Sequence, residues 1–326
     1  MKHVTHPFMF KDRRTIILHI GWPKTGTTTL QKHVLNKLTG FRYLGKTPFV
    51  GGKNKLTFDL VYFLAYASHE RAEIGAMELY SALTKLEVEL FGNVETSVPV
   101  VLSEEGVLSS LLKPSDHQHH GFSTASLEQI ISWLLQLEKA WNASFHILVT
   151  ERDPVEVLHA YYAQMFHVFR RLRGLDTFKG YVDTGVKDSL GRDLGFRYLR
   201  PDAVNRVLQQ RLGAGKVFTI AMDMLFTPGW AHLSRWYPAF PDLEIGNIAV
   251  ENKRSVSKDV KTTHLRPIWM EKERFRLRPF LRTVRDIYKE RYADHKDLEV
   301  PVVLEGSERS KLQEYLRADR APGDGK

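Results

Sequence analysis

A glycine-bounded turn near the N-terminus contains the residue types that bind an anion. The segment LHIGWPKTGTTTLQ, residues 18–31, runs from a short apolar stretch through a turn of glycine, proline and threonine into a helical pattern. Backbone N–H groups in such a turn, here those of residues 25–29, point toward a phosphate, and the threonine hydroxyls add further donors. The segment predicts a phosphate-binding loop.

The position of its lysine separates this loop from that of a nucleoside-triphosphate enzyme. Gly21 and Gly26 have the separation of the pattern GxxxxGK[ST], but Thr27 stands where that pattern has its lysine, and Lys24 lies upstream. An ammonium group at Lys24 suits a bridging or leaving oxygen, on which negative charge develops during group transfer. The alternative is a purely structural strand-to-helix turn capped by threonines.

A second cationic candidate follows a later apolar stretch. In FHILVTERDPVEVLHAYYAQ, residues 145–164, Arg152 stands just past a strand pattern and just before a helix that begins with proline. An arginine in this position can form charge-assisted hydrogen bonds with a phosphate. The alternative is that Arg152 pairs only with a carboxylate such as Glu151 or Asp153.

The two segments resemble motifs of sulfotransferases that use 3′-phosphoadenosine 5′-phosphosulfate (PAPS). PKTGTTTLQ is similar to the family's 5′-phosphosulfate loop, in the form that bacterial members have. The resemblance implies a P-loop-like fold and a sulfuryl transfer from PAPS to a hydroxyl acceptor, with a saccharide or glycolipid as the expected acceptor. It implies that the 5′-phosphate and sulfate are held by the loop, with candidate residues Pro23, Lys24, Thr25, Gly26, Thr27, Thr28 and Thr29.

The resemblance also assigns the 3′-phosphate to Arg152, with one departure. The family pattern has a serine eight residues after the arginine, and this sequence has Ala160 there. His159, Tyr161 or a basic residue near Arg170 are candidates to compensate. Farther along, the polar basic segment ENKRSVSKDVK, residues 251–261, lies where the family often completes its nucleotide site, so Lys253 and Arg254 are further candidates; a solvated charged loop is the alternative.

Two adjacent carboxylates are the candidates for the general base. Glu104 and Glu105 follow the strand pattern VPVVLS, where several sulfotransferases place a catalytic glutamate. We favour Glu104, because it is nearer the strand end, and keep Glu105 as the alternative. The structural alternative is that these residues only form the start of a helix.

The histidines of DHQHHGF, residues 116–122, indicate a flexible loop rather than a metal site, and one of them is a rival candidate for contact with the acceptor. Since the transferred group carries less charge than a phosphoryl group, no metal is expected. His19, inside the first strand, is expected to be a satisfied core histidine.

Alternating strand and helix patterns predict the frame that positions these residues. Buried strands are expected at residues 15–20, 98–103, 145–150 and 216–222, with a weaker one at 41–45, and helices at 27–38, 59–90, 126–141 and 154–173. The sequence therefore predicts a three-layer α/β fold with a parallel sheet and helices on both faces, followed by a helical C-terminal region with a basic helix at 267–297. Residues 173–200 are expected to be irregular, residues 1–316 to form one domain, and residues 317–326 to be disordered.

Composition limits the class of protein without choosing a ligand. The 326 residues contain 47 lysines and arginines against 38 acidic residues, a balance that favours an anionic partner, although no nucleic-acid-binding motif accompanies it. The chain has no cysteine, which excludes disulfides and thiolate chemistry. No apolar run is long enough for a membrane span, and a cytoplasmic location is expected. The rival functions are a P-loop kinase or NTPase and a degenerate nucleotide- or glycan-binding protein.

Overall fold

In the computed structural model, the chain forms two compact units. The described residues are 13–23, 25–45, 84–88, 90–92, 97–103, 106–112, 127–169, 174–188, 196–200, 202–226, 257–258, 262–265 and 302–317. They fall into a first unit, Met1–Asp153 with Gly191–Lys253, and a second unit, Pro154–Leu190 with Arg254–Lys326. The single domain over residues 1–316 stays a prediction.

A five-stranded parallel sheet forms the centre of the first unit. Its order is β2-β3-β1-β4-β5, and every pair of neighbours is parallel. The strands are β1 (Arg14–Gly21), β2 (Arg42–Tyr43), β3 (Val100–Ser103), β4 (Ala143–Glu151) and β5 (Val217–Ala221). All five predicted strands are thus confirmed. Six consecutive residues of β1 are buried, which is the continuous apolar pattern of a strand covered on both faces.

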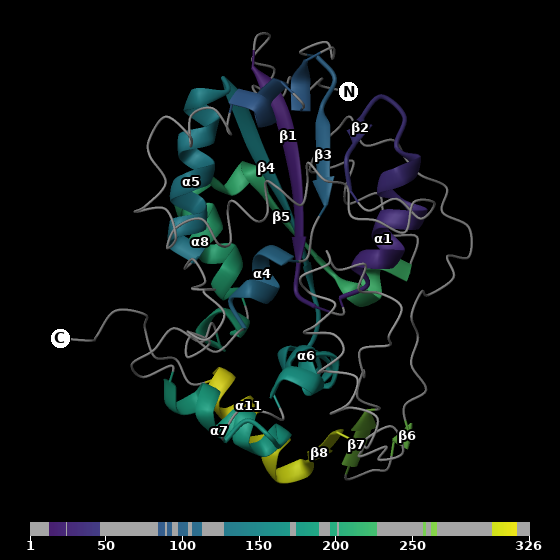
Figure 1. The fold of residues 1–326 in the computed structure, drawn as a ribbon, viewed down its shortest axis with the longest axis vertical. Coiled ribbons are helices and arrows are strands. Elements are labelled where there is room, and N and C mark those ends of the chain that lie inside the picture. The colour runs from purple at the N-terminus through teal and green to yellow at the C-terminus, as the bar shows by residue number, and fades with distance from the viewer. Residues whose placement is uncertain are drawn as a thin grey trace, which may run out of the picture. The chain divides into compact units, whose positions relative to one another are not determined.

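Helices cover both faces of this sheet, as predicted. The first unit contains α1 (Thr27–His33), α4 (Gly106–Ser110), α5 (Leu127–Ala140) and α8 (Ala203–Leu212), with 3₁₀ turns at Leu35–Lys37, Phe196–Leu199, Ala214–Lys216 and Met222–Phe226. Leu30 of α1 and Val34, which directly follows this helix, pack with Ile17, Val101 and Leu148 on one face of the sheet. Figure 1 shows α5 and α8 on the opposite side of the sheet from α1. Of the helix expected at residues 59–90, only 84–88 and 90 are described, and they are helical.

The strand order creates a switch point between β1 and β4. The chain leaves β1 toward β2 on one side of the sheet, whereas it leaves β4 toward β5 on the other side. In open parallel sheets, ligands bind at the carboxyl ends of strands where the connections diverge in this way. The loop after β1 and the residues after β4 both lie at this point, so the fold brings together the two segments that the sequence singled out.

The second unit combines helices with a small antiparallel sheet. It contains α6 (Pro154–Phe169), α7 (Phe178–Asp188) and α11 (Gly306–Arg317), and the strands β6 (Ser257–Lys258), β7 (Thr262–Leu265) and β8 (Val302–Glu305) in the order β6-β7-β8. The helix that was expected to start at Pro154 is confirmed, while the antiparallel sheet was not predicted. The basic helix expected at residues 267–297 lies outside the described residues, as do residues 318–326 of the tail expected at 317–326. The first residue of that tail, Arg317, is the last residue of α11 and not disordered.

Helix α7 contradicts the prediction that residues 173–200 are irregular. Phe178, Tyr181 and Val182 are buried, and Gly185 follows at the same helical spacing, so one face of the segment is apolar or small with a period of 3.6 residues. Tyr181 stacks on Phe169 of α6, with ring centroids 4.9 Å apart. Burial of this aromatic face outweighs the low helix propensity of the glycines that suggested a loop.

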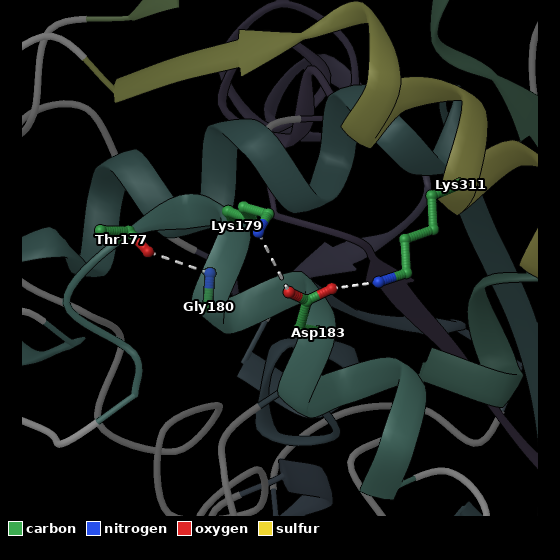
Figure 2. Close-up of polar contacts among 5 residues, drawn as sticks. All are labelled: Thr177, Lys179, Gly180, Asp183 and Lys311. Carbon is green, nitrogen blue, oxygen red and sulfur yellow. Dashed lines mark hydrogen bonds and ion pairs between the residues drawn. The ribbon is translucent and has the colours of Figure 1, made fainter.

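Thr177 caps α7, and removing its hydroxyl should weaken this helix. The backbone N–H of Gly180 donates to Thr177 Oγ1 at 3.0 Å, and Asp183 receives ion pairs from Lys179 and Lys311 (Figure 2). We expect Thr177→Ala to lower the free energy of unfolding by about 1 kcal/mol, because the first turn loses a hydrogen bond to a side chain. Thr177→Ser keeps the hydroxyl and serves as the control in urea unfolding and amide hydrogen exchange. Equal loss in both variants would contradict the capping role.

Candidate anion-binding site

The turn between β1 and α1 is a tight loop with one left-handed residue. Gly26 has φ 75° and ψ 11°, a conformation that glycine adopts without steric cost, and α1 begins at the next residue. The Leu30 N–H donates to the Gly26 carbonyl at 3.0 Å, which closes the first helical turn. The N–H groups of Thr27 and Thr28 precede that bond and have no helical acceptor, and within the described residues no side chain caps the helix. The loop can therefore offer backbone donors to an anion.

Gly21 serves a different purpose, which is to leave space. A Cβ atom at this position would lie 2.1 Å from Thr150 Oγ1, 3.0 Å from Thr25 Oγ1 and 3.2 Å from Thr27 Oγ1. Gly21 is the register partner of Thr150 on β4, so the threonine hydroxyl occupies the volume that a side chain on Gly21 would need. The first glycine of the motif thus permits a cluster of hydroxyl groups beneath the loop.

The threonines of the loop differ in what they can offer a ligand. The Thr25 hydroxyl is buried, donates to the Trp22 carbonyl at 2.7 Å and lies 2.9 Å from Thr150 Oγ1. Thr27 and Thr29 are also buried, whereas Thr28 is half-buried. The Thr25 side chain therefore shapes the loop, and Thr28 has the hydroxyl with the most solvent access.

Two residues beside the loop have structural surroundings. Trp22 is 3% exposed, in agreement with packing in the core rather than against a ligand. His19 is fully buried, and its two ring nitrogens lie within hydrogen-bonding distance of Ser103 and Thr150. His19 is thus the satisfied core histidine that was expected. Pro23 is buried as well.

Arg152 lies at the same edge of the sheet as the loop. β1 and β4 are neighbouring parallel strands, and Gly21 pairs with Thr150, so Arg152 follows the register partner of Gly21 by two residues. Its side chain is half-buried. The adjacent Glu151 is also partly buried, and burial, followed by the charge of Asp202, raises the pKa of its carboxyl group.

Several predicted site residues lie outside the described residues. They are Lys24, Glu104, Glu105, Lys253, Arg254 and the histidines His117, His119 and His120. The described residues on either side still fix which strands Lys24 and Glu104 follow. Lys24 belongs to the turn between Gly21 and Gly26, and Glu104 directly follows Ser103, the register partner of His19 on β3. The turn and the end of β3 are therefore attached to adjacent strands at one edge of the sheet.

The segment around Ala160 is buried inside the second unit. Ala160 is 8% exposed and Tyr161 is 2% exposed. His159 is fully buried, and its Nε2 donates to the Val302 carbonyl at 2.9 Å. The two residues that were named as substitutes for the missing serine therefore have packing roles in this unit, because the Nε2 proton of His159 is used and the Tyr161 ring contacts Phe169.

Sequence reasoning missed three polar residues that support the loop from below. They are Thr150, Ser103 and Gln31, all at most 1% exposed. The available signal was that each is a polar residue in an otherwise apolar strand end or helix face. Only the strand register shows that Ser103 and Thr150 both reach His19 on the strand between them, since β3 and β4 are far apart in the sequence.

Together, the loop and the adjacent arginine suit a ligand with separated anionic groups. Backbone N–H groups, a half-buried threonine hydroxyl and a guanidinium are donors for phosphate or sulfate oxygens. Among the described residues, no cluster of three or more histidine and acidic side chains could hold a metal ion. None of the helices in the described ranges is both long and apolar enough to cross a membrane.

These features define an α/β protein with a glycine-bounded loop at the switch point of a parallel sheet. No protein-family model matches the chain, and no curated protein matches it. Among solved structures, a crystal structure of a sulfotransferase from Alicyclobacillus acidocaldarius is similar, with a TM-score of 0.42 and 16% sequence identity over 74% of this chain and 87% of that chain.

Proposed function

We propose that this protein is a sulfotransferase that moves a sulfuryl group from PAPS to a hydroxyl acceptor. The observation that carries the proposal is the loop itself: a left-handed Gly26 and a side-chain-free Gly21 bound a turn whose only lysine is Lys24. This lysine lies on the upstream side of the turn, which suits a bridging oxygen rather than a terminal phosphate. Arg152 at the same sheet edge supports the proposal because it offers a second anion site for the 3′-phosphate.

The proposed transfer is an in-line displacement at sulfur. The acceptor oxygen forms a new bond to sulfur while the bond between sulfur and the bridging oxygen breaks. The ammonium of Lys24 stabilises the charge that develops on the bridging oxygen, and adenosine 3′,5′-bisphosphate leaves. Glu104, or Glu105 as the alternative, takes the proton of the acceptor hydroxyl. The loop amides of residues 25–29 hold the 5′-phosphate and sulfate, and Lys253 and Arg254 complete the nucleotide site. No metal is part of this proposal.

The acceptor we favour is a saccharide or glycolipid, and the location we propose is the cytoplasm.

Two rival functions make different predictions. A kinase or NTPase would need magnesium to bridge its phosphates, so its activity would stop when the metal is chelated. A binding protein without catalysis would bind adenosine 3′,5′-bisphosphate but transfer no sulfate.

The test of the function is sulfate transfer from labelled PAPS to a panel of saccharide and simple alcohol acceptors, with and without EDTA. Transfer that persists in EDTA is the expected result. Nucleotide binding without transfer to any acceptor would support the binding-protein alternative, and hydrolysis of ATP that requires magnesium would support the NTPase.

Replacing Arg152 with alanine should weaken binding of the nucleotide through its 3′-phosphate. A hydrogen bond to a charged group contributes about 1.5–3 kcal/mol, so we expect the Kd for adenosine 3′,5′-bisphosphate to rise roughly tenfold to a hundredfold. The Kd for adenosine 5′-phosphate, which lacks the 3′-phosphate, should change little. Isothermal titration calorimetry measures both, with Arg206→Ala as a control, since Arg206 is an exposed arginine of α8 in the same unit. Equal losses for the two nucleotides would show that Arg152 does not contact the 3′-phosphate.

A further inference from the structure

A chain of buried polar side chains joins the end of β3 to the phosphate loop. Its members come from five different segments of the first unit, and each is at most 1% exposed: Gln31 of α1, Ser103 of β3, His19 of β1, Thr150 of β4 and Thr25 of the loop. Figure 1 shows β3, β1 and β4 side by side, with β1 in the middle. His19, in the middle strand, is therefore the link between the two outer ones.

The hydrogen bonds on the loop side have a fixed direction. The single proton of the Thr25 hydroxyl goes to the Trp22 carbonyl, so Thr25 Oγ1 accepts the bond from Thr150 Oγ1, 2.9 Å away. That bond uses the only proton of Thr150. Thr150 Oγ1 must then accept from His19 Nε2 at 3.3 Å, which requires a proton on Nε2.

The bonds on the β3 side are compatible with the same form of the imidazole. Gln31 Nε2 donates both to Ser103 Oγ at 2.9 Å and to the Ser103 carbonyl at 3.3 Å, and the carbonyl contact fixes which end of the amide faces Ser103. Ser103 Oγ thus accepts from Gln31, and its own proton is available for His19 Nδ1, 2.6 Å away. In the neutral imidazole that carries its proton on Nε2, Nδ1 is bare and accepts this bond.

We propose that His19, as the neutral imidazole with its proton on Nε2, is a positioning residue that couples the phosphate loop to the end of β3. All donors along the chain point the same way, from Gln31 through Ser103, His19 and Thr150 to Thr25 and the Trp22 carbonyl. At one end the chain reaches the turn that contains Lys24, and toward the other end it passes through Ser103, the residue directly before Glu104. The proposal rests on the proposed function, since it assigns His19 a role in aligning the loop with the base.

The chemistry of the chain favours coupling over simple packing. A hydrophobic core does not require these hydroxyl, amide and imidazole groups, whose burial is costly unless each one is hydrogen-bonded. Because each bond in the chain fixes the direction of the next, loss of the bond at either end frees the imidazole to adopt the other tautomer. Loss of a hydrogen bond at one end of the chain thereby alters the hydrogen bonds at the other end.

The first test measures the tautomer. In protein with ¹⁵N-labelled histidine, the two ring nitrogens of His19 should give one N–H signal and one bare-nitrogen signal, assigned by their disappearance in His19→Gln. We expect this pattern in the unliganded wild-type protein. A proton on Nδ1, or on both nitrogens, would overturn the inference, whatever the protein catalyses.

The second test separates coupling from stability. Thr150→Val removes the hydroxyl but keeps the branched shape, and we expect it to raise the Kd for adenosine 3′,5′-bisphosphate about tenfold. Thr150→Ser, which keeps the hydroxyl, should restore binding. Ser103→Ala cuts the other end of the chain, and we expect it to lower kcat about tenfold while the KM for PAPS changes less than twofold. A purely structural role would lower the stability of Thr150→Val and Ser103→Ala without this split between binding and turnover.

The outcomes also distinguish the inference from the function on which it rests. If the wild-type protein binds adenosine 3′,5′-bisphosphate and Thr150→Val binds it equally well, the role of His19 is wrong and the function stands. If the wild-type protein neither binds the nucleotide nor transfers sulfate, the proposed function is wrong and the positioning role falls with it.

Discussion

Replacing Lys24 with alanine should lower the kcat for sulfate transfer by two to three orders of magnitude. The proposed transition state places negative charge on the bridging oxygen, and loss of one preorganised donor at such an oxygen costs about 2.7–4 kcal/mol. Because the backbone amides of the loop and Arg152 remain, the Kd for adenosine 3′,5′-bisphosphate should change much less than kcat. The measurement is steady-state transfer from labelled PAPS together with calorimetric binding of the product nucleotide.

A neighbouring lysine provides the control for this experiment. Lys37 lies in the 3₁₀ turn that follows α1 and is exposed, so Lys37→Ala removes the same charge from the same part of the chain without touching the loop. Its kcat should equal that of the wild-type protein. A Lys24→Ala protein with full activity would exclude the proposed role of Lys24, and an equal loss in Lys37→Ala would show that overall charge, rather than position, matters.

Replacing Gly21 with alanine should destabilise the first unit and impair the loop at the same time. The new methyl group would lie 2.1 Å from Thr150 Oγ1, so either the threonine side chain rotates and loses its bond to Thr25, or the backbone of β1 shifts. Overpacking of this kind costs about 1–3 kcal/mol, which we expect to see as a lower free energy of unfolding in urea. Binding of adenosine 3′,5′-bisphosphate should weaken in parallel.

Two further variants identify the cause of that loss. Gly215→Ala introduces the same methyl group where its Cβ meets nothing within 4 Å, and its stability should match the wild-type value. Thr150→Ala removes the atom with which the new methyl clashes, so the double variant Gly21→Ala/Thr150→Ala should lose less stability than the sum of the single variants. Additive losses would show that the clash with Thr150 is not the reason for glycine at this position.

The parallel sheet was predictable because each of its main strands has a recognisable local sequence pattern. Each of β1, β3 and β4 is a short run of apolar and branched residues, and each is buried on both faces by helices that the sequence also indicates. The turn after β1 was predictable for the same reason, since glycine, proline and threonine determine its shape within a few residues. These elements follow from local composition and periodicity alone.

Helix α7 shows where such reasoning failed. The glycines and aspartates between residues 173 and 200 indicated irregular structure, yet Phe178, Tyr181 and Val182 already have helical spacing. Periodicity was the better guide than composition, because the aromatic side chains gain more from burial than the glycines lose in propensity. The antiparallel sheet β6-β7-β8 was missed for another reason: its strands have only two to four residues, and β8 pairs with β7 across a long stretch of sequence.

The support beneath the loop could not be predicted from the sequence. The strand order places β1 between β3 and β4, and the register then sets Ser103 opposite His19 and Thr150 opposite Gly21. The local sequence pattern of a single strand determines neither the order of the strands in the sheet nor their register. The sequence therefore identified residues that we propose as ligand contacts, Lys24 and Arg152 among them, but not the buried side chains that hold the loop in shape.

The second unit is assembled from two stretches of chain that are synthesised at different times. Helices α6 and α7 emerge first, and β8 and α11 emerge only once residues 302–317 have been synthesised. These later elements reach the earlier ones through the His159–Val302 bond and the ion pairs of Arg309 with Glu156 and of Lys311 with Asp183. Until then the aromatic side chains of α6 and α7 lack part of their cover on the ribosome. Nascent chains halted before residue 302 should accordingly be sensitive to chaperone depletion and proteolysis in this region, whereas the parallel sheet is complete once β5 has emerged.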